Sequence, residues 1–237
     1  MLEILVYSGF YGNGQRSMSH CIKEKYQSRV IAKLDKQGKG AGEYNYLGPI
    51  LVEETGAWLE VLDGGKNSRR LRYSVPEFEL LEEDIMYIPS ANSCRKLDNF
   101  YYFSPQQNDN VVNGEPTNAD LIIVDGNTNT RKILFDKHIT TGGRYYSYNP
   151  ESFTTNEKGE LFASLMFDDT FYQLSGWDAT PILTFDFGEY GIDNSIGLKS
   201  TEEQTRYLNE DVKERAFFPG VKCEYGSSFC CFVFIYG

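Results

Sequence analysis

The hydrophobic residues of this chain fall in short runs that are rich in Val, Ile, Phe, Tyr and Thr and that end in clusters of Gly, Asn or Asp. Such runs are typical of β-strands bounded by turns, because branched and aromatic side chains suit a pleated surface and Gly and Asn suit tight turns. One arrangement recurs along the chain: a strand, a polar turn, and then a more apolar strand. The sequence therefore predicts an all-β protein built from repeated hairpins.

Four copies of this hairpin are found, at 48–62, 94–103, 152–167 and 221–236. In the two clearest copies a glycine, Gly56 or Gly159, stands at the equivalent place in the turn. Glycine suits a hairpin turn that needs a positive φ, because it carries no Cβ. The repeated turn chemistry indicates a repeated structural unit.

Two further strands are expected after each of the first three hairpins, so that each unit contains four. They are predicted at 70–75 and 78–81, at 121–124 and 132–135, and at 171–174 and 182–187. A unit of four antiparallel strands cannot bury both faces alone, so neighbouring units must stack. Radial stacking gives a β-propeller of four-stranded antiparallel blades. The competing fold is a β-sandwich, which gives no reason for a turn signature to repeat.

We expect a single β-propeller domain over residues 1–237, with partial first and last blades and a short helical insertion near 200–216. The helix is predicted because Ser200 to Glu203 has the form of a capping box, and Leu208, Val212 and Ala216 follow at i, i+4 and i+8. This segment is either a solvated connector between blades or a lid over one face of the propeller.

Composition and charge exclude some classes of partner. The 237 residues are 41% hydrophobic and 15% aromatic, enough for a substantial core, and the net charge is -11. This acidic balance repels a phosphate backbone and an anionic membrane surface, so we expect no nucleic-acid partner.

No apolar run reaches the roughly 20 residues of a membrane-spanning helix, so no transmembrane segment is expected. The start, Met1 to Tyr7, lacks the form of a signal peptide, so either the protein stays inside the cell or its true N-terminus is missing.

No sequence motif supports a metal or a cofactor. The five cysteines are odd in number and lack the paired spacing of a zinc or redox motif. The two histidines, His20 and His138, are too few for a multi-histidine site. The segment from Asp125 to Asp136 imitates a calcium loop but lacks the Gly at its sixth position and the final Glu, so we expect a β-turn there. The glycines at 38, 40 and 42 match neither a dinucleotide nor a Walker pattern.

Two sets of motifs resemble a known family. The run Gly38-Lys39-Gly40-Ala41-Gly42-Glu43-Tyr44 looks like the G-x-G-P-G-E-Y signature of the six-bladed β-propeller family of bacterial cell-envelope proteins, with Ala41 where the signature has Pro. This family is related in layout to NHL-repeat propellers. The segments 168–174 and 183–190 resemble its late-blade patterns N-D-T-I-Y-x-L and D-F-G-x-Y.

The resemblance extends from about Arg29 onward, and it implies six blades and a location in the cell envelope, in the periplasm or at the outer surface. About four complete units and two partial ones are counted, and the chain stops within a blade. We therefore expect a truncated member of the family, folded as an open arc of blades.

The candidate recognition surface is an aromatic loop that contains Arg144, Tyr145, Tyr146 and Tyr148. The Gly-Gly pair before it and the Asn-Pro pair after it break strand pairing. Tyrosine rings held on a loop can stack on a sugar ring or a peptide, and a guanidinium can bind a carboxylate.

Two functions remain open. The first is a non-catalytic binding or scaffold propeller of the bacterial cell envelope, with a glycan, peptide or protein ligand. The second is a hydrolase or lyase that uses the central funnel of the propeller, where acids such as Asp168 and Asp169 converge. A catalytic funnel needs charged residues from equivalent loops, and the loop residues here do not repeat in type. Binding is therefore preferred.

Overall fold

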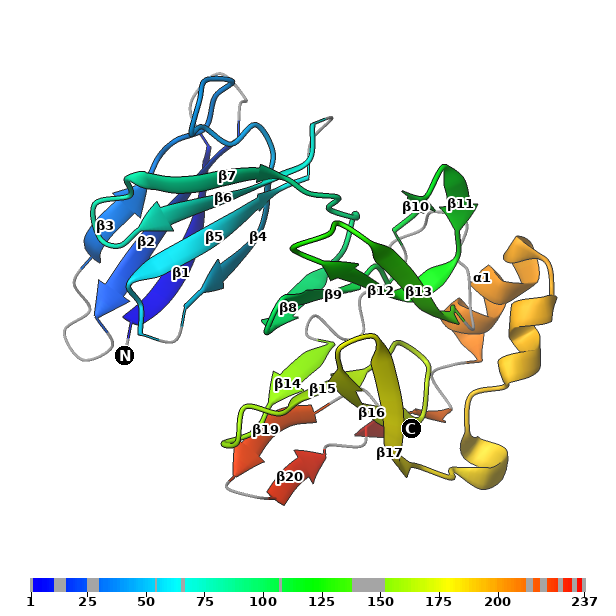
Figure 1. Cartoon of the computed structure of the whole chain (residues 1–237). Helices are drawn as coiled ribbons and strands as arrows, with labels where there is room; N and C mark the ends of the chain where they lie inside the picture. The colour runs from blue at the N-terminus through cyan, green and yellow to red at the C-terminus, as the bar shows by residue number, and fades with distance from the viewer. Residues whose placement is uncertain are drawn as a thin grey trace. The chain divides into compact units, whose positions relative to one another are not determined.

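The computed structural model describes residues 2–10, 16–24, 30–53, 55–64, 67–106, 108–137, 152–211, 215–217, 221–225, 228–231 and 234–235 of the chain. These residues form two compact units, Met1–Ile88 and Pro89–Gly237, which we treat separately (Figure 1). The described secondary structure consists of antiparallel β-sheets, two short 3-10 helices and one α-helix. The predicted all-β class is confirmed.

The first unit contains two antiparallel sheets. The three-stranded sheet consists of β1 (Leu2–Phe10), β2 (Arg16–Glu24) and β3 (Val30–Leu34). The four-stranded sheet has the order β4 (Leu47–Val52), β5 (Trp58–Asp63), β6 (Arg69–Ser74) and β7 (Leu80–Ile85). Leu59, Val61, Leu71 and Tyr73 of the central strands form its core together with Leu34 and Tyr44.

The second unit is built around two four-stranded sheets. One sheet has the order β13 (Arg131–Asp136), β12 (Ala119–Asp125), β9 (Phe100–Ser104) and β8 (Ser93–Leu97). The other has the order β14 (Phe153–Thr155), β15 (Leu161–Ser164), β16 (Thr170–Ser175) and β17 (Asp178–Thr184). The remaining elements are the hairpin of β10 (Asn110–Val112) and β11 (Glu115–Thr117), the 3-10 helices η1 (Gly188–Tyr190) and η2 (Asn194–Leu198), the helix α1 (Thr201–Glu210), and two strand pairs, β18 (Ala216–Phe217) with β21 (Phe234–Ile235) and β19 (Val221–Tyr225) with β20 (Ser228–Cys231).

The two four-stranded sheets of the second unit pack face to face. Tyr102, Leu121 and Ile123 of one sheet share a core with Leu161 and Tyr172 of the other. Burial of apolar side chains such as these contributes about 1.5–3 kcal/mol each. This packing is the stacking of neighbouring blades that the repeated units require.

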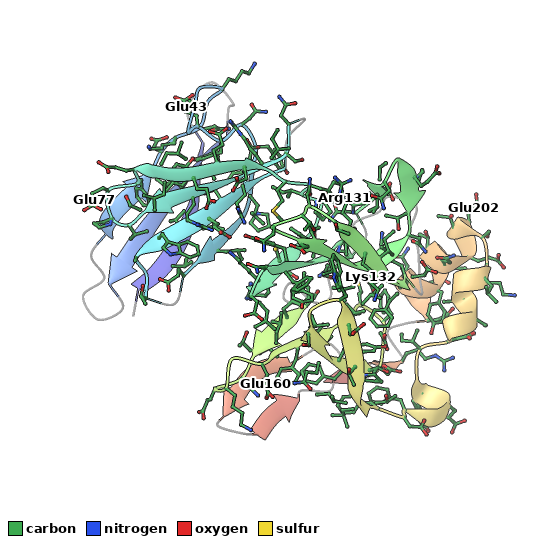
Figure 2. The ribbon with its side chains drawn as sticks, viewed as in Figure 1. Glu43, Glu77, Arg131, Lys132, Glu160 and Glu202 are labelled. Carbon is green, nitrogen blue, oxygen red and sulfur yellow. The ribbon has the colours of Figure 1, made fainter. Side chains whose placement is uncertain are left out.

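Polar contacts fix the register between the same two sheets. Lys132 lies on β13 (Figure 2). Its ammonium donates to the carbonyl of Trp177 at 2.8 Å. The Tyr102 hydroxyl donates to the carbonyl of Gly176 at 2.9 Å, and the Trp177 ring meets the Phe100 ring edge-on with 4.9 Å between centroids. The turn between β16 and β17 is therefore held against the neighbouring sheet.

A hairpin forms at each of the four predicted places, but the last is shorter than the predicted 221–236, because Phe234–Ile235 of β21 pair with β18 instead. The hairpins are β4–β5, β8–β9, β14–β15 and β19–β20, each paired antiparallel. The two turn glycines adopt φ values of 73° at Gly56 and 77° at Gly159. Each also donates its amide to the carbonyl three residues earlier, at 2.8 Å and 3.0 Å respectively. The repeated turn signature thus has a repeated geometry.

Two outer strands lie at other positions than predicted. The strand predicted at 78–81 is β7, which begins at Leu80, because Phe78 turns the chain with a φ of 55° and buries its ring. The strand predicted at 182–187 is β17, which starts at Asp178. Among the described residues there are three four-stranded sheets, fewer than the four complete units that the sequence count gave.

The helix α1 begins with the predicted capping box. The Glu203 amide donates to the Ser200 hydroxyl at 3.3 Å, and the Ser200 amide donates to the Glu203 carboxylate at 3.1 Å. The helix is shorter than predicted, because Ala216 lies in β18 and pairs with Ile235. Its buried face is Gln204, Tyr207 and Leu208, and the last two pack on Met166, Phe167 and Ile192.

The turn geometry gives a first prediction. Gly159→Ala should destabilise the protein by about 1–2 kcal/mol, because a Cβ is disfavoured at positive φ even though nothing lies within 4 Å of the added atom. Gly159→Asn should cost less, since Asn tolerates this region. Chemical unfolding is the measurement, with the exposed neighbour change Lys158→Ala as the control. Equal stability of the wild type and Gly159→Ala would show that the turn does not constrain the fold.

Candidate functional site

The glycine-rich signature at 38–44 forms a compact turn. Tyr44 is fully buried, its amide donates to the Lys36 carbonyl at 2.9 Å, and the Gly38 amide donates to the Tyr44 carbonyl at 3.0 Å. A Cβ on Gly38 would lie 1.9 Å from a carboxylate oxygen of Glu43, which itself accepts the Gly40 amide at 2.8 Å. The amides of Gly38 and Gly40 therefore serve the turn itself.

Asp63 docks this turn on its own sheet. Its carboxylate, on a residue that is 1% exposed, accepts the amides of Asn45 and Tyr46 at 2.8 Å each and the Arg69 guanidinium at 3.3 Å. Arg69 also donates to the Glu43 carbonyl. The signature thus has a structural role in the first unit.

Asp63→Asn should therefore destabilise the first unit by about 2–4 kcal/mol. The change weakens two buried hydrogen bonds from backbone amides, and it removes a negative charge that compensates the positive charge of the Arg69 guanidinium. Thermal and urea unfolding measure the loss. Glu77→Gln, an exposed acid of the same unit, is the matched control. A variant as stable as the wild type would refute the docking role of Asp63.

The two late-blade motifs are also turn elements. Asp168 accepts the Thr170 amide at 2.9 Å on one oxygen and the Tyr172 hydroxyl at 2.7 Å on the other. Burial, with the nearby Asp168 carboxylate, raises the pKa of Tyr172 well above its usual value. Asp186 accepts the Gly188 amide at 2.8 Å, where Gly188 has a φ of 55°. Both oxygens of Asp168, one of the two acids considered for catalysis, are thus used within its own sheet.

The calcium-like segment is the predicted β-turn. Asp125 accepts the Asn127 amide on its side chain at 2.8 Å, and its carbonyl accepts the Asn129 amide at 2.8 Å. Among the residues with described side chains, no group of three or more His, Cys, Asp or Glu is placed to hold a metal ion.

One end of the second unit carries its longer connections. The two sheets meet there at Ser93, Ser104, Ser152 and Ser164, and we call this the connection end. The Ser152 hydroxyl donates to the Ser104 hydroxyl at 2.9 Å, and the Ser152 amide to the Ser93 hydroxyl at 3.4 Å, so both sheets share this end. The connections that leave from it span 105–118, 137–152 and 185–200.

A chain of neutral polar side chains crosses the connection end. Gln106 donates to the Ser152 hydroxyl at 3.4 Å and accepts from the Asn92 amide at 2.8 Å, while Asn108 donates to the Asn92 oxygen at 2.9 Å. Gln106 is fully buried and has a φ of 52°, a conformation that is uncommon for a residue with a Cβ. Such local strain is found most often at functional sites.

The most perturbed acid in the described part of the chain is Asp120, the second residue of β12. It is 2% exposed, and its Oδ1 atom has no hydrogen-bond partner among the described residues. Burial raises the pKa of Asp120 to about 7, with the Lys137 charge opposing this shift and the Asp168 charge adding to it. Burial also lowers the pKa of Lys137. A buried carboxyl with a shifted pKa is a candidate for a functional site.

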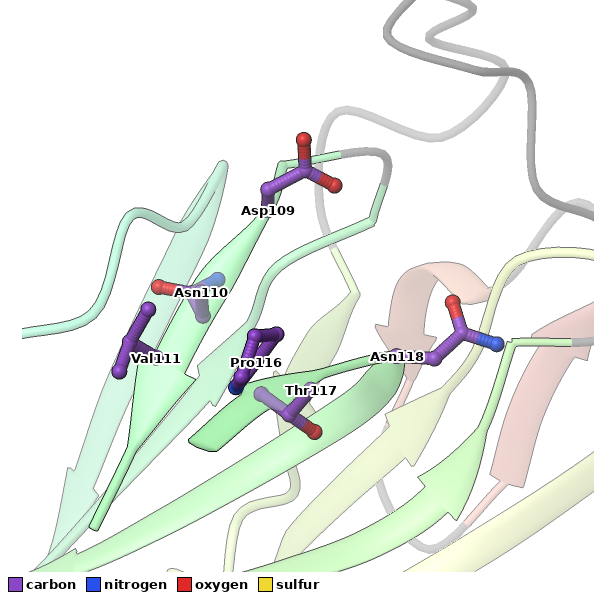
Figure 3. A pocket seen from close by; sticks show the side chains of 6 residues that line it. All are labelled: Asp109, Asn110, Val111, Pro116, Thr117 and Asn118. Carbon is purple, nitrogen blue, oxygen red and sulfur yellow. The ribbon is translucent and has the colours of Figure 1, made fainter. Parts of the chain in front are cut away.

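An open hollow lies beside this pair. Its lining comes from the β10–β11 hairpin and the residues around it, namely Asp109, Asn110, Val111, Pro116, Thr117 and Asn118 (Figure 3). Asn110 braces the hollow, because it accepts the Ser90 amide at 2.7 Å and donates to the Ser90 carbonyl at 2.9 Å. The exposed Asp109 and Asn118 extend away from the ribbon.

The sequence-predicted recognition residues Arg144, Tyr145, Tyr146 and Tyr148 lie outside the described residues, as does His138. The residues that flank this segment are described, and Lys137 and Ser152 both lie at the connection end. Sequence reasoning missed Asp120 and the polar chain around Gln106. The one sequence feature that pointed to Asp120 was its place directly before the apolar run 121–124. A polar residue at the start of a strand is common, so this feature does not single out a functional acid.

Repeated four-stranded antiparallel sheets, two of which pack face to face in the second unit, are the blades of a β-propeller. The chain belongs to a family of 6-bladed β-propellers, DUF5128, whose model matches residues 26–222. The predicted six-bladed type is thus confirmed. Within the described part of the chain no helix is long and apolar enough to cross a membrane.

A solved structure shows the same fold at low sequence identity. A "Putative exported protein" from Bacteroides fragilis NCTC 9343 is 16% identical with a TM-score of 0.63, and the match covers 98% of this chain and 70% of that one. A member of the DUF4221 family from Bacteroides vulgatus ATCC 8482 is 10% identical with a TM-score of 0.49, over 79% and 65% of the two chains. A comparison with curated proteins finds no match.

The Asp120 environment predicts a pH-dependent stability. Because the pKa of the folded state is raised, the contribution of Asp120 is fully present below about pH 4 and is lost as the pH rises through about 7. Asp120→Asn should therefore match the wild type near pH 4 and exceed its stability near pH 8, by up to about 4 kcal/mol. Urea unfolding from pH 4 to 8 measures this, with exposed Asp136→Asn as the control. A parallel pH profile for both variants would contradict it.

Proposed function

We propose that this protein is a non-catalytic binding or scaffold propeller of the bacterial cell envelope, which holds a glycan, peptide or protein at the connection end of its second unit. The observation that carries the proposal is the asymmetry of the strand connections. At the opposite end the strands are joined by short turns, at 98–99, 126–130, 156–160 and 176–177. Long connections on a rigid sheet scaffold are where binding residues concentrate.

The chemistry of this end suits a neutral, hydrogen-bonding ligand. The hollow presents amide, hydroxyl and carboxylate groups beside the apolar side chains of Val111 and Pro116. Sugars and peptides offer hydroxyl or amide groups to such a surface and an apolar face to rings. Arg144, Tyr145, Tyr146 and Tyr148 are the proposed contacts, on a segment whose flanking residues lie at this end.

The cell-envelope location is supported by the family resemblance and by the name of the Bacteroides fragilis protein that shares the fold. The alternative of a hydrolase or lyase has less support. Asp168 already binds two groups of its own sheet, and Asp120 is 98% buried, so neither carboxyl is presented to a substrate.

The proposal predicts a loss of binding without a loss of stability. Replacing Tyr145, Tyr146 and Tyr148 together with Ala should reduce retention on arrays of bacterial glycans and peptides by about tenfold or more, as expected when stacking contacts of about 1 kcal/mol each are removed. The melting temperature should stay nearly constant.

The matched control for this experiment is Tyr46→Ala, which removes a 65% exposed tyrosine of the first unit, away from the connection end in the sequence. It should leave retention unchanged. If the triple variant instead loses several kcal/mol of stability, the rings belong to the core and the proposed contacts are wrong. If it keeps full retention with normal stability, the ligand does not bind there.

A further inference from the structure

The β10–β11 hairpin presents a small apolar surface to the hollow. In the register of this hairpin Val111 lies opposite Pro116, so both side chains are on one face. Asn110 and Val112 alternate with Val111 along β10 and are buried, whereas Val111 is 55% exposed and Pro116 is exposed as well. The inward residues anchor the hairpin, and the outward pair is accessible from the hollow.

Three polar side chains beside this apolar pair have hydrogen-bonding capacity that no described residue uses. Asp109 is exposed, and within the described part of the chain its carboxylate accepts no hydrogen bond. Asn118 is exposed and uses one N–H on the Lys137 carbonyl at 3.4 Å, which leaves its oxygen and its second N–H. Thr117 accepts the Ala119 amide at 3.1 Å and can still donate its hydroxyl proton.

The polar groups just outside the hollow are instead occupied by one another. The Asn108 side chain donates to the Asn92 oxygen and to the Pro105 carbonyl, at 2.9 Å each. The Asn108 carbonyl accepts the Lys137 ammonium at 2.9 Å. These bonds hold the base of the connection, so the groups that are left to contact a ligand are those that line the hollow.

We infer that the hollow is a subsite for a sugar residue of an uncharged oligosaccharide, and that Asp109 and Asn118 bind its hydroxyl groups. The inference rests on the proposed function and deepens it, because it selects one of the three ligand classes proposed for the connection end. The volume of the hollow, about 540 Å³, lies within the roughly 300–1,000 Å³ of small-molecule sites.

The chemistry of the lining matches that of a sugar ring. Each sugar hydroxyl both donates and accepts a hydrogen bond. The Asp109 carboxylate can accept from two hydroxyls, and the Asn118 amide can accept from one and donate to another. The C–H groups of the ring pack on the apolar pair of Val111 and Pro116.

A peptide fits this lining less well. Extended peptides commonly bind by adding a strand to a sheet edge, where main-chain N–H and C=O groups alternate. Pro116 is the middle residue of β11 and has no N–H to offer. The lining supplies side-chain donors and acceptors instead, which suits the scattered hydroxyls of a sugar.

An acidic sugar is disfavoured by charge. Asp109 is the ionisable residue of the lining, and the ammonium of Lys137 is partly buried and already bonded to the Asn108 carbonyl. Salt screens charges that lie beyond about 8 Å at physiological ionic strength. The local Asp109 carboxylate, more than the net charge of -11, therefore decides whether an anion is repelled from the hollow.

Retention of the full chain on immobilised hexasaccharides, at about 0.15 M salt, tests the inference. The neutral probes are mannohexaose, maltohexaose and N-acetylchitohexaose, and the acidic probe is hexagalacturonate. The wild type should be retained on at least one neutral probe and not on the acidic one. Asp109→Ala and Asn118→Ala should each reduce retention on that neutral probe about tenfold, because each removes hydrogen bonds to hydroxyls. Melting temperatures should stay nearly constant, since both side chains are exposed.

Asp109→Asn separates charge from hydrogen bonding. This variant keeps an acceptor for hydroxyls, so it should lose less retention on the neutral probe than Asp109→Ala. Its retention on hexagalacturonate should rise about fivefold, because a repulsion of about 1 kcal/mol is removed. The matched control is Glu115→Gln, which neutralises an exposed acid of the same hairpin outside the lining and should change neither retention.

Several results would overturn the inference. They are a wild type retained on no neutral probe, unchanged retention in both Asp109→Ala and Asn118→Ala, and retention of the wild type on hexagalacturonate equal to that on the neutral probes. A wild type that binds only peptides would overturn it as well. In that case, loss of peptide binding in the triple tyrosine variant would still support the proposed function, so the two proposals fail separately.

Discussion

A four-stranded antiparallel sheet of this protein has more apolar surface than it can bury by itself, and the packing of one sheet on the next is the constraint on which the second unit depends. Tyr102, Leu121 and Ile123 share a core with Leu161 and Tyr172 of the following sheet. The ends of the strands are buried in this interface together with the core. Their polar groups lose contact with water there and therefore need hydrogen-bond partners within the protein. At the turn end, Tyr102 and Lys132 meet this requirement by donating to backbone carbonyls of the neighbouring turn.

At the connection end the same requirement is met in a different way. Ser104, Ser152 and Gln106 form a neutral chain in which each group has a partner, and such a chain costs little in a buried place. Asp120 departs from this rule, because it is a buried carboxyl with an oxygen that has no partner among the described residues, and such a group reduces stability near neutral pH. Departures of this kind are expected at functional sites, where local cost is offset elsewhere in the fold. In this protein the residue that reduces stability, Asp120, lies at the end of the sheets from which the longer connections leave.

The sequence predicts the architecture well because the strands and turns are determined by short sequence patterns. The hairpins follow from alternating apolar runs and from turn residues such as Gly56 and Gly159, whose geometry is fixed within a few residues. The outer strands are less predictable, because Phe78 looks like a strand residue and instead turns the chain to bury its ring. The site is least predictable. The proximity of Asp120, Lys137 and Asp168 arises from the pairing of β12 with β13 and from the packing of two sheets, and no local pattern encodes it.

The position of Asp120 also bears on the choice between binding and catalysis. A pKa near 7 is what a general acid needs, but a general acid must reach the atom to which it gives its proton. Asp120 is enclosed, and the groups that interact with it belong to the protein itself, to Lys137 and to the residues around Asp168. Burial alone raises the pKa of an acid, so the shift of Asp120 follows from its place in the core and is not by itself a sign of catalysis.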